Sequence, residues 1–164
     1  HTIFTERHNA HVKTYMKINE KHDINNKIQI EFVDNWEEVF EKHHDSILKC
    51  IAIDEDLDKI QKAKAELAKC EGLETVSSSK NNFEVMCEGV SKGRAVEMLA
   101  AYYKIPREAV ICVGDSENDM SMIQFAGLGV AMGNADKEIK EIAQFVTLSN
   151  EEDGVAKVIE KYIL

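Results

Sequence analysis

The run Gly114-Asp115-Ser116-Glu117-Asn118-Asp119 has the clearest chemical potential in this sequence. It follows a predicted buried strand and opens a predicted helix, and open α/β sheets bind ligands at such strand ends. Asp115 and Asp119 are four residues apart, so their carboxylates can point the same way. Mg²⁺ prefers hard oxygen ligands and keeps several waters, which suits these carboxylates. Asn118 adds an amide that can hydrogen-bond a phosphoryl oxygen or support a ligand.

The same residues also have a purely structural interpretation. Ser116-x-x-Asp119 resembles a capping box with Asp in place of Glu, and acidic residues in a first helical turn suit the helix dipole. From these six residues alone, helix capping and ligand binding are about equally supported, because an acidic helix start is ordinary.

Lys92 is the second candidate, in the run Gly89-Val90-Ser91-Lys92-Gly93. A lysine at the start of a helix is unfavourable for the dipole, which indicates a role such as holding an anionic group. Taken alone, a solvated lysine is favoured by about four to one, since that is the default for this residue.

Other candidates are weaker. Neither His8 and His11 nor the adjacent His43 and His44 complete a familiar zinc spacing. The acidic run Asp54-Glu55-Asp56 is most simply a helix cap with a solvated face. We therefore expect no metal site at the histidines and no chemistry at the acidic run.

Composition excludes several classes of protein. The formal net charge of −10 argues against nucleic-acid binding and against anionic membrane surfaces. No apolar run approaches the roughly 20 residues of a membrane helix, and no signal peptide is recognisable at the start. None of the four cysteines, at 50, 70, 87 and 112, form a Cys-x-x-Cys pair, so we expect reduced thiols and a cytoplasmic protein. Cys50, Cys87 and Cys112 lie in apolar, strand-like runs, where we expect a free thiol to pack as a small apolar residue. His1 is not an initiator methionine, and Ile3-Phe4 has the pattern of a strand already under way, so we expect part of a longer parent.

The elements that must position these side chains change character near residues 80–88. Before this boundary, the pattern predicts strands at 2–5, 27–33 and 46–53, and helices at 6–20, after Asn35 and at 54–69. It also predicts a hairpin of 73–78 with 82–87. Together these elements indicate an α+β domain. After it, helices at 92–104, 117–126, 137–143 and 152–163 alternate with strands at 109–113, 129–132 and 144–148. This alternation is typical of a parallel, doubly wound sheet.

Apolar periodicity predicts which helix faces are buried. Val96, Leu99, Ala100 and Tyr103 share one face of the first of these helices, and Val155, Val158, Ile159 and Tyr162 are spaced at i, i+3, i+4 and i+7 in the last. In the third helix, Ile139, Ile142 and Ala143 are expected to face inward.

Three motifs together carry a family resemblance: Lys92-Gly93, then Gly114 to Met120, then Val130-Ala131-Met132-Gly133-Asn134-Ala135. The combination resembles the haloacid dehalogenase-like (HAD) hydrolases, and within them the Cof-type sugar-phosphate phosphatases. The resemblance implies an α/β fold, with residues 83–164 forming the C-terminal part of a doubly wound, Rossmann-like core. Residues 1–82 resemble the family's α+β cap domain, which covers the site and selects the substrate.

The resemblance also implies roles for individual residues. Lys92 matches the catalytic lysine that binds the phosphoryl group, and Asn118 matches the asparagine near that group. Asp115 matches the catalytic Mg²⁺ ligand, and Asp119 matches an aspartate that supports the metal. The implied reaction hydrolyses a small phosphorylated metabolite through an aspartyl phosphate, with Mg²⁺ as cofactor.

One departure from the family pattern decides what this polypeptide can do. The family nucleophile lies in an Asp-x-Asp-Gly-Thr motif, which is absent here. Asp54-Glu55-Asp56 has the spacing but is followed by Leu57-Asp58 within the cap-like part, so we reject it. We expect an inactive fragment of an active phosphatase. Without the first core strand, strand 109–113 would have an unpaired edge, which another chain, a retained cleaved piece or self-association would complete.

Two other interpretations stay open at this stage. A non-catalytic ligand-binding or interaction module could use the same scaffold, because fold does not fix function. The catalytic region of a P-type ion pump shares the Gly-Asp-x-x-Asn-Asp pattern, but the cap-like front half and the lack of a membrane segment argue against it.

Overall fold

The computed structural model describes residues 2–5 and 29–164, so the helix predicted at 6–20 and the histidines within it lie outside the described residues. The chain forms two compact units, His1–Leu48 and Lys49–Leu164. In the first, strands β1 (Thr2–Thr5) and β2 (Gln29–Phe32) pair in parallel and helix α2 (Trp36–His43) follows. The Asn35 side chain accepts a hydrogen bond from the Glu37 amide, which confirms the predicted cap.

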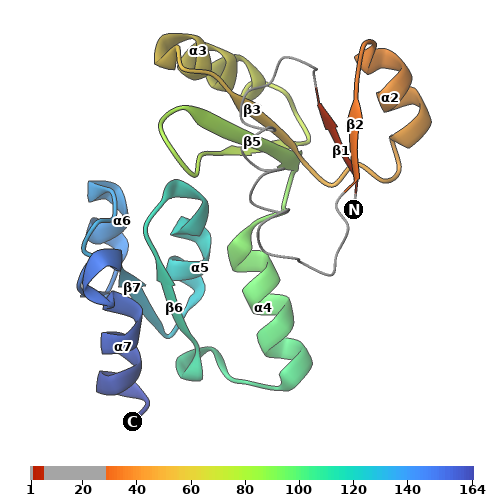
Figure 1. Cartoon of the computed structure of the whole chain (residues 1–164). Helices are drawn as coiled ribbons and strands as arrows, with labels where there is room; N and C mark the ends of the chain where they lie inside the picture. Colours follow the sequence, from red (N-terminus) through yellow and green to blue (C-terminus); the bar gives the residue numbers. More distant parts are fainter. Residues whose placement is uncertain (1, 6–28) are drawn as a thin grey trace. The chain divides into compact units, whose positions relative to one another are not determined.

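The second unit begins with a three-stranded antiparallel sheet in the order β3-β5-β4. Its strands are β3 (Cys50–Ile53), β4 (Leu73–Val76) and β5 (Asn82–Cys87), and helix α3 (Leu57–Leu67) lies beside them (Figure 1). The Asp56 side chain caps α3 by accepting from the Lys59 amide. Ile60 and Phe83 are buried and form the apolar centre of this sheet and helix.

Two expectations for this region are wrong. The strand predicted from residue 46 begins only at Cys50, because the amides of Ser46 and Ile47 turn back to hydrogen-bond the His43 carbonyl at 2.8 and 3.1 Å. Cys50 and Cys87 are exposed rather than packed as small apolar residues, since they lie at the ends of their strands.

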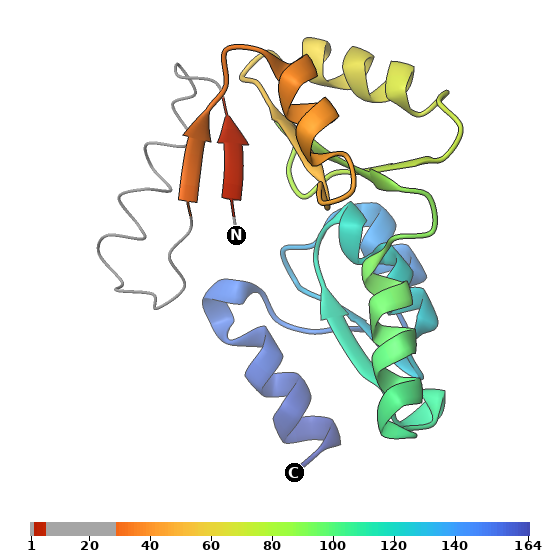
Figure 2. The ribbon, with the colours of Figure 1, turned by 90° about the vertical axis from the view of Figure 1, so that its right-hand side faces the viewer.

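The rest of the unit is a parallel sheet in the order β6-β7-β8, which confirms the predicted fold class. Helices α4 and α7 lie on opposite sides of this sheet in both views (Figures 1 and 2). The elements in chain order are α4 (Lys92–Tyr103), β6 (Ile111–Gly114), α5 (Met120–Phe125), β7 (Leu128–Ala131), α6 (Lys137–Ile142), β8 (Phe145–Val146) and α7 (Gly154–Tyr162), with short 3₁₀ turns at Arg107–Ala109, Glu117–Asp119 and Asn150–Glu152.

The core of the parallel sheet is built from Ile123, Ala131, Met132, Ala135 and Ile139. Ile139 is buried as predicted, with Ile142 and Ala143 packed against the cluster. The helices predicted at 92–104 and 152–163 are present as α4 and α7, but of the apolar residues on their shared faces only Ala100 and Val158 are buried. Leu99, Tyr103, Val155, Ile159 and Tyr162 are exposed, although the Tyr162 ring meets the Phe145 ring edge-on at 5.6 Å.

Among the helices that the structure describes, none has the length and apolarity needed to span a bilayer. The division into a cap over 1–82 and a core over 83–164 stays a prediction.

Candidate active site

The loop between β6 and α5 is organised by one buried carboxylate. Asp119 is 5% exposed, and its Oδ2 accepts hydrogen bonds from the amides of Asp115 and Ser116 at 3.0 and 3.3 Å. The bond from Ser116 closes the predicted capping box. The structural interpretation of this motif is therefore correct, and it leaves the functional one open.

Gly114 allows the chain to make this turn. A Cβ at position 114 would lie 2.7 Å from the carboxyl carbon of Asp119, closer than real Cβ contacts come. Only glycine therefore lets the end of β6 pass so close to the Asp119 side chain.

The unfavourable position of Lys92 at a helix start has a clear explanation. Its ammonium lies 2.5 Å from Asp119 Oδ1 and 3.2 Å from Asn118 Oδ1. The N-cap of α4 is Ser91, whose hydroxyl accepts a hydrogen bond from the Arg94 amide. Capping therefore does not explain why a lysine lies at this helix start. The Lys92 charge instead pairs with side chains on the loop that follows β6.

Close packing of α4 on α5 brings Lys92 to this loop. The Gly93 amide donates to Ser121 Oγ at 3.0 Å, and a Cβ on Gly93 would lie 2.5 Å from the Ser121 carbonyl oxygen. The two helices therefore approach at a point where only glycine fits.

Asp115 stands at the carboxyl end of β6 and is held on both sides. Its Oδ1 accepts from Ser116 Oγ at 3.0 Å and its Oδ2 from Asn134 Nδ2 at 3.1 Å. Asn134 in turn accepts from the Asn150 amide at 3.0 Å. The sequence analysis assigned no role to Asn134, although its place just after β7, the strand next to β6, was a usable signal.

The two carboxylates differ in what they can still bind. Asp115 is half-buried, and each oxygen accepts one side-chain hydrogen bond, so lone pairs remain for a cation. Asp119 has one oxygen on Lys92 and the other on two amides. The donor chemistry therefore fits Mg²⁺ at Asp115, with Asp119 holding the loop.

The structure brings the Lys92 ammonium into contact with Asn118 and Asp119. The Asp119 carboxylate in turn accepts a hydrogen bond from the backbone amide of Asp115. No group of three or more His, Cys, Asp or Glu side chains placed to hold a metal occurs among residues 2–5 and 29–164. An ion pair with Lys59 holds the pKa of Asp54 below its ordinary value, consistent with its place in the turn before α3.

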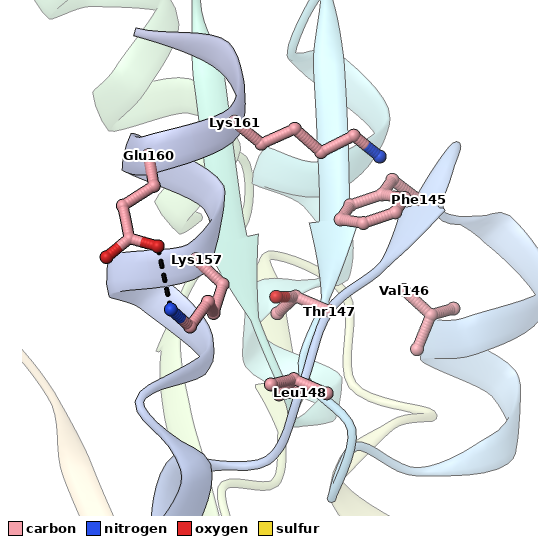
Figure 3. Close-up of a pocket in the computed structure, with 7 residues that line it drawn as sticks. All are labelled: Phe145, Val146, Thr147, Leu148, Lys157, Glu160 and Lys161. Carbon is pink, nitrogen blue, oxygen red and sulfur yellow. Dashed lines mark hydrogen bonds and ion pairs between the residues drawn. The ribbon is translucent and has the colours of Figure 1, made fainter. Parts of the chain in front are cut away.

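A groove of about 400 Å³ lies elsewhere, between β8 and α7 (Figure 3). It is lined by Phe145, Val146, Thr147, Leu148, Lys157, Glu160 and Lys161, none of which belongs to the site predicted from the sequence.

The chain is similar to known phosphatases in sequence and to solved structures in fold. The phosphatase YwpJ of Bacillus subtilis is 51% identical over 90 residues, 55% of this chain and 32% of that protein. The 5-amino-6-(5-phospho-D-ribitylamino)uracil phosphatase YwtE of the same organism is 40% identical over 119 residues, 73% of this chain and 42% of that protein. The chain thus spans less than half the length of these relatives.

A solved haloacid dehalogenase-like hydrolase from B. subtilis superposes with a TM-score of 0.73 at 38% identity, over 84% of this chain and 48% of that one. The profile of the haloacid dehalogenase-like hydrolase family matches residues 1–159. This chain belongs to the haloacid dehalogenase-like hydrolases.

Proposed function

We propose that this chain is the C-terminal part of a Mg²⁺-dependent phosphatase that hydrolyses small phosphorylated metabolites. The observation that carries the proposal is the cluster at the end of β6. There the Lys92 ammonium contacts the side chains of Asn118 and Asp119, on the loop that also bears Asp115. Phosphoryl transfer depends above all on positioning and charge neutralisation, and this cluster supplies groups for both.

Each residue has a distinct part in the proposed reaction. Lys92 neutralises the phosphoryl oxygens, and Asn118 donates its amide hydrogens to one of them. The hydrogen bonds from Ser116 and Asn134 hold the Asp115 carboxylate in one orientation. Asp119 holds the turn of the loop through the Asp115 amide, and it holds the Lys92 ammonium beside the loop through an ion pair.

Asp115 would hold the magnesium ion, which supplies Lewis-acid stabilisation of the charge that develops on the phosphoryl group. Asp119 would support this site through the loop, because both of its oxygens already accept hydrogen bonds.

The names of the relatives support a proposal for the substrate class. YwtE is named for a substrate that carries a phosphorylated ribityl chain, and YwpJ is named only as a phosphatase. We propose a phosphorylated sugar or sugar-derived metabolite for this protein.

The nucleophile is proposed to come from a preceding segment of a longer protein, because the sequence contains no Asp-x-Asp-Gly-Thr motif. The 164 residues alone would then be inactive and would associate with a second chain or with themselves along the free edge of β6. The four free thiols support the further proposal of a reducing, cytoplasmic location.

The test is phosphate release by the longer protein from a panel of sugar phosphates, with Mg²⁺ and with a chelator. We expect Lys92→Ala to lower turnover about a hundredfold or more, since it removes charge from the transition state. Asp115→Asn should weaken Mg²⁺ binding and turnover together.

Lys157→Met, a change on α7 outside this cluster, is the control and should retain turnover. Wild-type rates in both site variants would refute the assigned roles. Full activity from the 164-residue chain would refute its proposed inactivity, and a longer protein without phosphatase activity would favour a binding module.

A further inference from the structure

The Glu117 side chain contacts the antiparallel sheet and the helix beside it. Its Oε2 accepts hydrogen bonds from Lys64 Nζ on α3 at 2.5 Å and from the Ser77 amide, just after β4, at 3.0 Å. Lys64 also donates to Ser77 Oγ at 3.0 Å. The Glu117 contacts span 53 and 40 residues of sequence, so they join parts of the chain that only folding brings together.

The backbone of the same loop repeats this connection. The Asn118 amide donates to the Ser77 carbonyl at 3.2 Å, while the Asn118 side chain accepts from Lys92. One residue therefore binds the antiparallel sheet with its backbone and the candidate phosphoryl-binding lysine with its side chain.

The ion pair between Lys64 and Glu117 is partly shielded from water, so its loss should have a measurable effect. The Lys64 side chain is 18% exposed, whereas that of Glu117 is 43% exposed. An ammonium held in so little water and left without its carboxylate is strongly disfavoured, unlike one in a fully solvated surface pair.

We propose that Glu117 is a positioning residue that latches the antiparallel sheet, through Lys64 and Ser77, onto the loop that holds Asp115 and Asn118. When the sheet leaves the loop, the bonds at Glu117 and Asn118 break together, and the loop loses its outer support. The link to turnover rests on the proposed function, with the antiparallel sheet acting as part of the cap. Cap closure and ordering of the active-site loop are then one event.

The latch itself is tested on the 164-residue chain by amide hydrogen exchange resolved by NMR. Glu117→Ala should speed exchange of the Ser77 and Asn118 amides about tenfold, because charged hydrogen bonds contribute on that scale. Lys64→Met should act in the same direction, and the double variant should exceed the larger single effect by less than twofold.

Lys157→Met removes a lysine from another glutamate pair, Lys157–Glu160 at 2.7 Å, and should leave both amides unchanged. Circular dichroism checks that each variant folds. If Glu117→Ala does not fold, the exchange test uses Lys64→Met instead. Unchanged exchange in a folded Glu117→Ala or Lys64→Met variant overturns the latch.

The coupling to turnover is tested in the longer protein. Glu117→Ala should lower kcat/KM about tenfold for a phosphorylated metabolite that requires cap closure, and less than twofold for p-nitrophenyl phosphate. An equal loss on both substrates overturns the coupling. Faster exchange combined with no phosphatase activity in the longer protein would refute the proposed function and leave the latch standing.

Discussion

At the scale of single residues, Asp119 has the largest structural effect in the candidate site. It is buried, and it accepts hydrogen bonds from two amides and from an ammonium. A carboxylate so placed stabilises the loop whether or not the loop binds a ligand. This is why the capping and binding interpretations of the motif do not exclude each other.

We expect Asp119→Ala to lower the free energy of unfolding by about 2 kcal/mol, because the hydrogen bonds that this buried carboxylate accepts from two amides and an ammonium are lost. Urea denaturation measures this change. Asp58→Ala, at an exposed aspartate in the first turn of α3, is the control and should stay within about 0.5 kcal/mol. Equal effects of the two changes would show that the loop does not depend on Asp119.

The capping interaction between Ser149 and Glu152 makes the stability of the fold depend on pH. Hydrogen bonds from the hydroxyl and amide of Ser149 hold the pKa of Glu152 below its ordinary value of 4.5. A lowered folded-state pKa means that this contribution to stability is present above about pH 4.5. It is lost as the pH falls through the folded-state pKa.

Ser149→Ala should therefore raise the pKa of Glu152 toward 4.5, whereas Ser149→Thr should keep it depressed because the hydroxyl remains. Carboxyl carbon shifts in an NMR titration report both values. An unchanged pKa in Ser149→Ala would mean that the serine does not cause the shift.

At the scale of elements, the contact between α4 and α5 decides where Lys92 lies. Gly93 is buried against the Ser121 backbone, one position after the lysine. Any side chain there must push α4 away from α5, and Lys92 would move with its helix.

Gly93→Ala should destabilise the chain by about 1–3 kcal/mol, because steric overlap outweighs the better helix propensity of alanine. Thermal or urea denaturation provides the measurement. Ala95→Ser, at an exposed position on the same helix, should change stability by less than about 0.5 kcal/mol. A gain in stability from Gly93→Ala would show that the helices are not in close contact.

At the scale of the whole molecule, the chain leaves apolar surface uncovered. In the described part, β6 pairs with β7 on one side only. Large apolar side chains are exposed on α4 and on α7 with the residue after it, namely Met98, Leu99, Tyr102, Tyr103, Val155, Ile159, Tyr162 and Ile163. The groove in Figure 3 adds Val146 and Leu148 to this surface. Such surface marks an interaction face or promotes association.

We therefore expect the 164-residue chain to self-associate as its concentration rises, and to bind an apolar dye. Analytical ultracentrifugation over a hundredfold concentration range measures the association. The longer protein is the control, because its preceding segment would cover the edge of β6. A chain that stays monomeric and binds no dye would contradict this expectation.

Short-range chemistry was readable from the sequence. The caps at Asn35 and Asp56, the hairpin of β4 and β5, and the strand-to-helix turn at Gly114–Asp119 depend on residues within a few positions of each other. Hydrophobic periodicity was less reliable for α4 and α7, because it reports which face is apolar and not whether another element covers it.

The sequence by itself thus determined the fold class, the alternating helices and strands after residue 88, and the loop on which the candidate site stands. Only the tertiary structure decided that Lys92 meets Asp119 and Asn118, that Asn134 holds Asp115, and that Glu117 turns outward to Lys64. These contacts join residues 19 to 53 positions apart. Their geometry depends on how helices and sheets pack, and no local pattern of residue types encodes that packing.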